Sequence, residues 1–356
     1  MISKEDILKS LSNVLDPVAK KDLVSLEAVK NIKISKNKIK IEILTSTSSY
    51  RLKEVIRRNC ITELKKNNLE NNYFIDFSID SNREEDLEED SKNSKFKIQN
   101  IKNIIAITSG KGGVGKSTIS SNIAVGLGKL GSKVGLIDAD IFGPSIPTMF
   151  NCEYEQPTYK KENEKNIIIP IEQYGIKLLS IGLMIPKENA VIWRGPMASS
   201  AIKQMILDVD WGELDYLIVD LPPGTSDIHI TLSQNFEING SIIITTPQKI
   251  STIDAEKAVA MFKKENTEVP ILGIIQNMSH FISDDGDKHF IFGEDGGKDL
   301  SKKLDLELLG DIPIDKNISK SSDNGYPVVL KEENTSLLFE KICHNIARKI
   351  AENNFK

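Results

Sequence analysis

The sequence predicts an α/β fold in which a doubly wound, mostly parallel sheet is preceded by a small α+β domain. Two observations carry this prediction. From Ile101 onward, short apolar runs alternate with helical patterns, an order typical of a parallel sheet with helices on both faces. Before it, the stretch 81–100 is dense in charge and poor in apolar residues. We therefore expect a domain over 1–80, a solvated linker over 81–100 and a domain over 101–356.

Within 1–80, the pattern predicts two helices and three strands. Ser3 and Asp6 have the spacing of a capping box, and Asp16-Pro17 is expected to end the helix that they open. A second helix is predicted at Arg51–Lys66. The expected strands are Val29–Ile34, Ile39–Leu44 and Tyr73–Ile79.

Within 101–356, several strand candidates are continuous apolar runs, as strands buried on both faces require. The expected strands are Ile104–Thr108, Val134–Asp138, Ile176–Ile181, Tyr216–Asp220, Ser241–Thr246, Ile271–Gln276 and Leu306–Ile312. The expected helices are Lys116–Leu130, Ala198–Val209, Ile253–Glu265 and Glu340–Glu352. An apolar stripe near the C-terminus is expected to pack on this domain rather than on a membrane. It consists of Leu337, Leu338, Phe339, Ile342, Ile346 and Ile350.

The composition is that of a globular protein in a reducing compartment. Of the 356 residues, 39% are hydrophobic, and the net charge of −5 argues against nucleic-acid binding as the main activity. The sequence contains neither a secretory signal nor an apolar run of about 18 residues. Its three cysteines are widely separated, without metal-ligand or disulfide spacing. We expect a soluble cytoplasmic protein that binds no membrane and no nucleic acid.

The strongest motif is a phosphate-binding loop. Gly110–Ser117 matches G-x-x-x-x-G-K-S/T between a predicted strand and a predicted helix. Glycines let successive backbone N–H groups turn towards a phosphate, and the helix N-terminus adds favourable charge. Lys116 is expected to reach the β- and γ-phosphates of ATP, and Ser117 to supply a hydroxyl to Mg²⁺. The expected nucleotide-binding residues are Gly110, Lys111, Gly112, Gly113, Val114, Gly115, Lys116, Ser117 and Thr118.

Lys111 is a second lysine in this loop, which a general P-loop does not need. One interpretation is a cation that reaches the nucleotide of a facing subunit, in the manner of an arginine finger. The other is an exposed lysine on a turn. The residues alone leave both interpretations open.

Acidic residues follow two further predicted strands, where ligand chemistry collects in such sheets. Of Asp138 and Asp140, one carboxylate would hold Mg²⁺ through water and the other would orient the attacking water. Asp220 ends a buried run, as the metal-binding acid of a P-loop NTPase does. Any of these acids, Asp227 in the following loop included, could instead be a helix N-cap, an interpretation that fits Asp227 best and Asp220 least. The stiff turn 222–225 is expected near the γ-phosphate of ATP. Loss of that phosphate on hydrolysis would change the conformation of this turn, and so of the surface around it, rather than drive a chemical synthesis.

Together these motifs resemble those of the Mrp/ApbC group of iron–sulfur cluster carrier ATPases, within the deviant Walker A class of P-loop NTPases. The matching segments are GKGGVGKST, DADIFGPSIP, WRGPM, VDLPPGTSD, TTPQ, QNMS and IFGEDGG, and they span roughly 101–350. Residues 1–80 resemble the small iron–sulfur assembly domain that often precedes this ATPase.

The resemblance implies an ATP-hydrolysing, Mg²⁺-dependent homodimer that works with iron–sulfur assembly machinery and delivers clusters to apoproteins. It implies that Lys111 reaches the nucleotide of the partner subunit. It also implies that Asp140 positions the attacking water, while Asp220 supports the metal. Asn277 matches the asparagine that reads adenine, since a side-chain amide both donates and accepts on a base edge.

The chain departs from this family at the cluster ligands. Many members carry a Cys-x-x-Cys pair between the QNMS and IFGEDGG segments, but 280–289 contains no cysteine here. Serine and aspartate are poor substitutes for thiolates. We expect the remaining candidates to be inert or solvated: Cys60, Cys152, Cys343, His280 and His289. The iron–sulfur ligands are therefore not identified.

Three other functions remain open. One is a membrane- or DNA-positioning ATPase of the septum and partition type. Another is an assembly factor that does not itself hold a cluster. The third is a scaffold in which the nucleotide is only a structural ligand.

Overall fold

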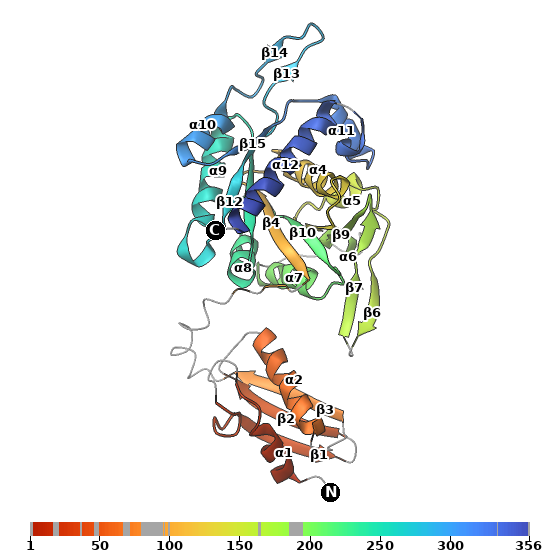
Figure 1. Ribbon diagram of the computed structural model, residues 1–356, viewed down its shortest axis with the longest axis vertical. Coiled ribbons are helices and arrows are strands. Elements are labelled where there is room, and N and C mark those ends of the chain that lie inside the picture. The colour runs from red at the N-terminus through yellow and green to blue at the C-terminus, as the bar shows by residue number, and fades with distance from the viewer. Residues whose placement is uncertain are drawn as a thin grey trace. The chain divides into compact units, whose positions relative to one another are not determined.

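The computed structural model describes residues 3–16, 21–35, 38–45, 50–66, 72–79, 95, 97–98, 100–162, 165–184, 195–332 and 334–354. The chain divides into two compact units, Met1–Ser94 and Lys95–Lys356, and each is described by itself (Figure 1). The division falls inside the predicted linker 81–100, most of which lies outside the described residues. So do Trp193 and Arg194 of the WRGPM segment.

The first unit is a three-stranded sheet with two helices on one face. Its elements are α1 (Lys4–Leu11), β1 (Val29–Ser35), β2 (Lys38–Thr45), α2 (Tyr50–Lys66) and β3 (Asn72–Ile79). β1 pairs with β2 antiparallel, and β2 pairs with β3 parallel. The core lies between sheet and helices, where Ile7 of α1 and Ile56 of α2 are buried with Ile41 of β2. The predicted α+β pattern is confirmed.

The helix α1 begins as predicted but ends earlier. The capping box between Ser3 and Asp6 is present. The helix stops at Leu11, because the chain turns at Ser12, whose hydroxyl donates to the carbonyl of Lys9 over 2.8 Å. The predicted end at Asp16-Pro17 is therefore wrong, and Pro17 itself lies outside the described residues.

The second unit is an eight-stranded sheet in the order β15-β12-β11-β4-β10-β5-β9-β8. Every neighbouring pair is parallel except the edge pair of β8 and β9. The strands are β4 (Ile101–Ser109), β5 (Val134–Asp138), β8 (Ile171–Gln173), β9 (Ile176–Ser180), β10 (Leu214–Asp220), β11 (Gly240–Thr245), β12 (Ile271–Gln276) and β15 (Leu308–Asp311). The predicted doubly wound, mostly parallel sheet is confirmed.

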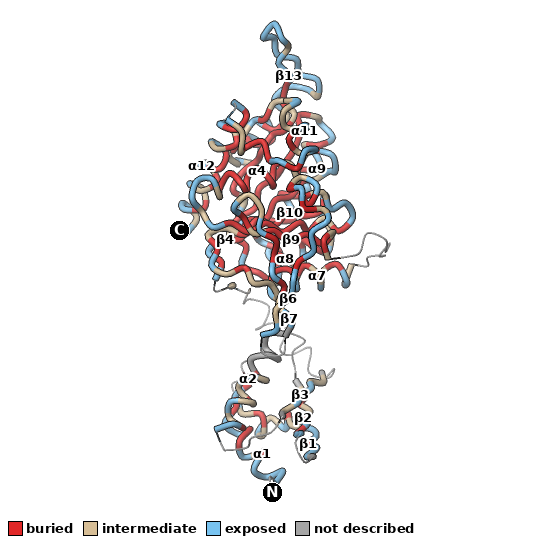
Figure 2. Tube along the Cα trace, turned by 90° about the vertical axis from the view of Figure 1, so that its right-hand side faces the viewer, coloured by how far each residue is buried: buried red, intermediate tan, exposed pale blue. Residues whose placement is uncertain are grey.

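Helices cover both faces of this sheet (Figure 1). The helices are α4 (Lys116–Lys129), α5 (Ile146–Met149), α6 (Ile181–Met184), α7 (Gly195–Leu207), α8 (Asp227–Asn235), α9 (Lys249–Phe262), α10 (Gly296–Leu304), α11 (Lys316–Asp323) and α12 (Asn334–Asn354). One apolar core lies under α4, α5 and α12, and another lies under α7, α8, α9 and α10. Figure 2 shows the buried residues concentrated along the strands and the helix faces that meet them.

All seven strands and four helices predicted for this unit are present, but several elements were missed. The missed elements are α5, α6, α8, α10, α11, β8 and the hairpins β6–β7 (Thr158–Glu162 and Lys165–Ile169) and β13–β14 (Phe281–Ile282 and Lys288–His289). They are short or carry few buried apolar residues. α11, for example, buries only Ser321. Without a repeating apolar pattern, such elements leave no periodic signal in the sequence.

The predicted apolar stripe on α12 packs on the domain. Phe339, Ile342, Ile346 and Ile350 are buried in the core that they share with α4. Leu337 is 62% exposed, so the prediction is wrong there. At 100° per residue it lies about 200° around the helix from Phe339, on the solvent side. Among the described residues, no helix is long and apolar enough to cross a bilayer.

Candidate functional site

The carboxyl ends of four parallel strands bring the predicted site residues to one edge of the sheet. β4 leads into the phosphate-binding loop, β5 ends at Asp138, β10 ends at Asp220 and β12 leads into Asn277. In register, Asp220 lies beside Asp138 on one side and beside Ile107 of β4 on the other. The topology therefore gathers residues that are far apart in the sequence.

The glycines of the phosphate-binding loop are required by its packing. Gly113 and Gly115 have φ angles of +80° and +84°, which glycine adopts without strain. A Cβ at Gly115 would overlap the side-chain amide of Asn277, and a Cβ at Gly110 would overlap the backbone of Asp254 in α9. Neighbouring segments therefore hold the loop at both of its ends.

The loop borders a cavity of about 210 Å³. The cavity is lined by Ser109, Lys111, Gly112, Gly113, Gly115, Lys116, Ser117, Thr118, Asp140, Ser145, Met149 and Pro223. The first turn of α4 opens onto it, and the N–H groups of a first turn have no partners within their helix. A helix N-terminus also carries partial positive charge. The cavity therefore has the chemistry of a phosphate site. The side chain of Val114, also predicted, is buried in the core, and its part in nucleotide binding stays a prediction.

Lys116 connects the loop to the acidic strand ends. Its Nζ lies 2.8 Å from Asp220 Oδ2 and 3.9 Å from Asp140 Oδ2. Ser117 Oγ donates to the same oxygen of Asp220 over 2.6 Å, and Ser120 Oγ donates to Oδ1 over 2.6 Å. Lys116 is 6% exposed and Asp220 is fully buried, so water screens this pair little. Asp220 thus fixes the cation and the hydroxyl beside the cavity.

Asp138 and Asp140 have different surroundings. Asp140 lines the cavity, whereas Asp138 is fully buried. The carboxylate of Asp138 accepts hydrogen bonds from the backbone N–H groups of Asp140 and Ile146 and from Ser180 Oγ, over 3.2, 3.2 and 3.0 Å. Burial and the charge of Asp220 raise the pKa of Asp138 to about 7, and burial raises the pKa of Asp140. Asp138 therefore shapes the loop after β5, and its assignment to Mg²⁺ stays a prediction.

Lys111 lies on the phosphate-binding loop, whereas Asn277 follows β12 and contacts the loop from outside. Lys111 is exposed, and its Nζ makes no ion pair or hydrogen bond with the described residues. Asn277 is 8% exposed, and its Nδ2 donates to the carbonyl of Val114 over 2.8 Å. Asn277 therefore braces the loop, a contact that sequence reasoning did not predict. The nucleotide roles of both residues stay predictions.

Four further polar residues near the site were missed or misplaced. Ser120 holds Asp220, and its spacing of three residues from Ser117 on α4 was a usable signal. Ser180 holds Asp138 from another strand, which no local pattern indicates. The predicted cap at Asp227 is wrong by one residue, because Ser226 has the extended backbone of an N-cap and Asp227 begins α8. His229 of α8 is fully buried beside β4.

The cysteines lie in the apolar cores, as their inert interpretation requires. Cys60 is in the core of the first unit, and Cys152 and Cys343 are in a core of the second. Burial raises the pKa of each thiol to about 12. No group of three or more His, Cys, Asp or Glu side chains among the described residues is placed to hold a metal ion.

The two histidines of the segment 280–289 differ from each other. His289 is exposed on β14, as expected. His280 is 9% exposed, and its Nδ1 lies 2.9 Å from Ser279 Oγ. The prediction of a solvated His280 is wrong because the segment after β12 folds back, so that the backbone N–H of Ile314 donates to the carbonyl of His280.

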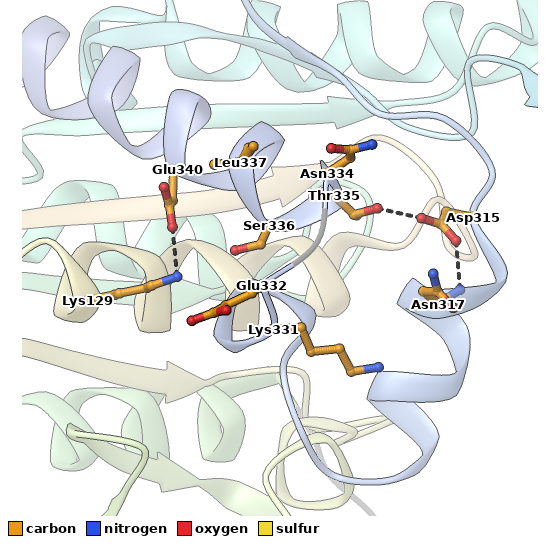
Figure 3. A pocket seen from close by; sticks show the side chains of 10 residues that line it. All are labelled: Lys129, Asp315, Asn317, Lys331, Glu332, Asn334, Thr335, Ser336, Leu337 and Glu340. Atoms are coloured by element: carbon orange, nitrogen blue, oxygen red, sulfur yellow. Dashed lines mark hydrogen bonds and ion pairs between the residues drawn. The ribbon is translucent and has the colours of Figure 1, made fainter.

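A larger cavity of about 700 Å³ lies beside α4, α11 and α12, away from the predicted site residues (Figure 3). Several of its polar side chains satisfy one another. Lys129 pairs with Glu340 over 2.7 Å, and Asp315 accepts from Thr335 and from the backbone of Asn317. The smaller cavity at the phosphate-binding loop is therefore the candidate functional site, because it collects the predicted residues.

A glycine loop between β4 and α4, a buried lysine and an acid at the end of β10 define a P-loop nucleotide-binding protein. Residues 100–351 match the family model of the NUBPL iron-transfer P-loop NTPases. Residues 4–71 match the model of an iron–sulfur cluster assembly protein. The chain therefore belongs to the iron–sulfur cluster carrier family of P-loop NTPases, which confirms the resemblance of its motifs.

Individual relatives agree with this membership. The chain is 38% identical over 343 residues to the iron–sulfur cluster carrier protein of Escherichia coli, which covers 96% of this chain and 90% of that protein. It is 36% identical to the protein of that name from Synechocystis, over 99% and 98% of the two chains. Among solved structures, it is similar to a nucleotide-binding protein from Archaeoglobus fulgidus in complex with ADP. That match has a TM-score of 0.55 and 38% identity, and it covers 64% of this chain and 87% of the other.

Proposed function

We propose that this protein binds and hydrolyses ATP with Mg²⁺ and, as a homodimer, carries iron–sulfur clusters to apoproteins. The observation that carries the proposal is the cavity at the phosphate-binding loop, where Lys116 and Ser117 are held on the buried Asp220. Family membership supports the cluster-carrying part, and the ADP bound by the Archaeoglobus fulgidus protein supports the nucleotide part.

The residues at the cavity fit Mg²⁺. Ser117 and Asp220 supply hard oxygen donors, the kind that Mg²⁺ prefers, within 2.6 Å of each other. We assign both residues to the metal, which when bound neutralises charge on the phosphate oxygens. The backbone N–H groups of the loop and the Lys116 ammonium bind the phosphates. Asp140, which faces the cavity, orients the attacking water. We assign Asn277, which contacts the loop at Val114, to the adenine.

The cluster is cargo on this proposal, and the described cysteines do not hold it. An anaerobic mixture of the protein, iron, sulfide and an apo-ferredoxin tests the two parts separately. We expect phosphate release that depends on Mg²⁺, and faster formation of holo-ferredoxin with ATP than with ADP. Ser117→Ala should remove both effects. Absence of phosphate release would refute the ATPase, and equal transfer rates with ATP and ADP would refute ATP-driven delivery.

Lys111→Ala should reduce hydrolysis more than binding. Lys111 is exposed and lacks a partner among the described residues, so it is available to a nucleotide on a second subunit. A clamp of this kind acts mainly as charge develops in the transition state. We expect kcat to fall at least about tenfold and the Kd for ATP to change less than about threefold. Lys264→Ala, at another exposed lysine, is the matched control and should change neither. Equal losses of kcat and affinity would argue against the clamp.

A further inference from the structure

His229 lies between α8 and the strand that leads into the phosphate-binding loop. It is fully buried and is the third residue of α8. The backbone N–H of Ser226, the N-cap, donates to His229 Nδ1 over 3.2 Å. Glu or Gln usually accepts this hydrogen bond in a capping box. On the other side of the ring, Nε2 lies 2.9 Å from Thr108 Oγ1.

These contacts determine which ring nitrogen carries the proton. Nδ1 accepts from a backbone N–H, so it carries no hydrogen, and a neutral ring then has its hydrogen on Nε2. Nε2 therefore donates to Thr108 Oγ1. Burial and the charge of Lys116 lower the pKa of His229 to about 4, which keeps the ring neutral at neutral pH. The two hydrogen bonds and the neutral ring are mutually consistent.

Thr108 is the central residue of three that tie β4 to the loop 221–226. The backbone N–H of Leu221 donates to the carbonyl of Ile107 over 2.9 Å, and that of Gly224 donates to the carbonyl of Ser109 over 2.8 Å. These two contacts are backbone hydrogen bonds, whereas the contact between Thr108 and His229 joins two side chains. His229 belongs to α8, the helix that follows the loop. The loop is therefore held to β4 from both of its ends.

The loop 221–226 also faces the cavity. Pro223 lines it opposite Gly112 of the phosphate-binding loop. A change in this loop when phosphate arrives or leaves would displace the start of α8 unless the helix is anchored. The Thr108–His229 hydrogen bond supplies an anchor of this kind, from the strand to the first turn of the helix.

We infer that His229 is a positioning residue that locks the loop 221–226 and the first turn of α8 to β4, in the arrangement that places Asp220 for hydrolysis. The inference rests on the proposed function, because the reaction that it serves is ATP hydrolysis. His229 touches neither nucleotide nor metal on this view, and it acts through the loop.

Two substitutions at His229 separate its contacts with Ser226, whose Oγ also lies 3.1 Å from Nδ1, from its hydrogen bond with Thr108. His229→Asn keeps an oxygen near the position of Nδ1 but is too short to reach Thr108. His229→Gln places an amide nitrogen near the position of Nε2. We expect His229→Asn to lower kcat about tenfold with less than about a twofold change in the Kd for ATP, and His229→Gln to recover most of kcat. Thr231→Val breaks a hydrogen bond from α8 to Ser199 of α7 and is the matched control, which should keep full kcat.

A double-mutant cycle tests the contact itself. Thr108→Val should lower kcat about as much as His229→Asn, and combining them should add nothing further, because both remove the same hydrogen bond. Additive losses of kcat, or unchanged kcat in both single variants, would overturn the inference.

Two measurements do not depend on hydrolysis. Nitrogen-15 NMR of the His229 ring should show the hydrogen on Nε2, and hydrogen exchange in 221–226 should be faster in His229→Asn than in the native chain, with ADP bound to both. If the native chain lacked ATPase activity, the proposed function would fail while these measurements still reported on the lock. A hydrogen on Nδ1, or unchanged exchange, would overturn the lock even in an active ATPase.

Discussion

Lys116→Ala should lower ATP hydrolysis by about 10² to 10³ fold and remove most nucleotide binding. The Lys116 ammonium lies beside Ser117 Oγ, at 3.2 Å, and at the cavity that the loop surrounds. Its loss takes away the buried side-chain cation that we assign to the phosphates. Phosphate release and calorimetric titration with ATP measure the two effects. Unchanged turnover would refute the assignment of the phosphate-binding loop.

The same substitution should destabilise the fold. It leaves the fully buried Asp220 without its ion-pair partner, at a cost of about 3–5 kcal/mol. We expect the Tm of the variant to fall by about 10 °C. Lys116→Ala combined with Asp220→Asn should regain much of the Tm but none of the turnover, which separates the two roles. Lys129→Ala, on the same helix, breaks a partly exposed ion pair with Glu340 and a hydrogen bond to the carbonyl of Val329, and it should keep both turnover and most of the Tm.

The three thiols should react about 10³ times more slowly in the folded protein than in the unfolded chain. Burial raises the pKa of Cys60, Cys152 and Cys343 from 9.0 to about 12, so each thiolate is about 10³ times scarcer near pH 8. Rates of alkylation by iodoacetamide in buffer and in guanidinium chloride measure this ratio. Rapid alkylation of one cysteine in buffer would contradict the burial of that residue.

Because thiolates are scarce, we also expect the protein to bind little stable iron–sulfur cluster. Thiolates are the usual ligands of iron–sulfur clusters, and the three sulfurs lie in three separate parts of the apolar cores. Iron measured after anaerobic reconstitution should therefore fall well below one cluster for every two chains. A robust yield of one cluster per pair of chains would show that cysteines move to the surface on loading.

The elements that sequence reasoning predicted share one property. Strands such as β4 and β10 are continuous apolar runs, and helices such as α4 and α12 repeat apolar residues at helical spacing. The local sequence pattern therefore indicates which residues of these elements are buried. α11 buries only Ser321 and so lacks that pattern, while α8 has nine residues and only two buried apolar ones, Ile228 and Leu232; both helices were missed. The P-loop was predicted because glycine, lysine and hydroxyl positions there follow each other along the chain.

Contacts between residues that are far apart in the sequence leave no local pattern of this kind. The hydrogen bond between Asn277 and Val114 joins residues that are 163 positions apart in the sequence, and the one between His229 and Thr108 joins residues that are 121 positions apart. Ser180 meets Asp138 because β9 lies beside β5. These pairs depend on strand order and register, which local spacing does not specify.

The sequence by itself determined the fold class, the phosphate-binding loop and the family, because each is carried by residues that are neighbours in the chain or by periodic burial. Only the tertiary structure decided that Asp140 faces the cavity while Asp138 is buried. It also decided that Ser226 rather than Asp227 caps α8, and that the three cysteines are buried in the apolar cores. The physical reason is that the burial and hydrogen-bond partners of a side chain depend on which distant segments pack against it.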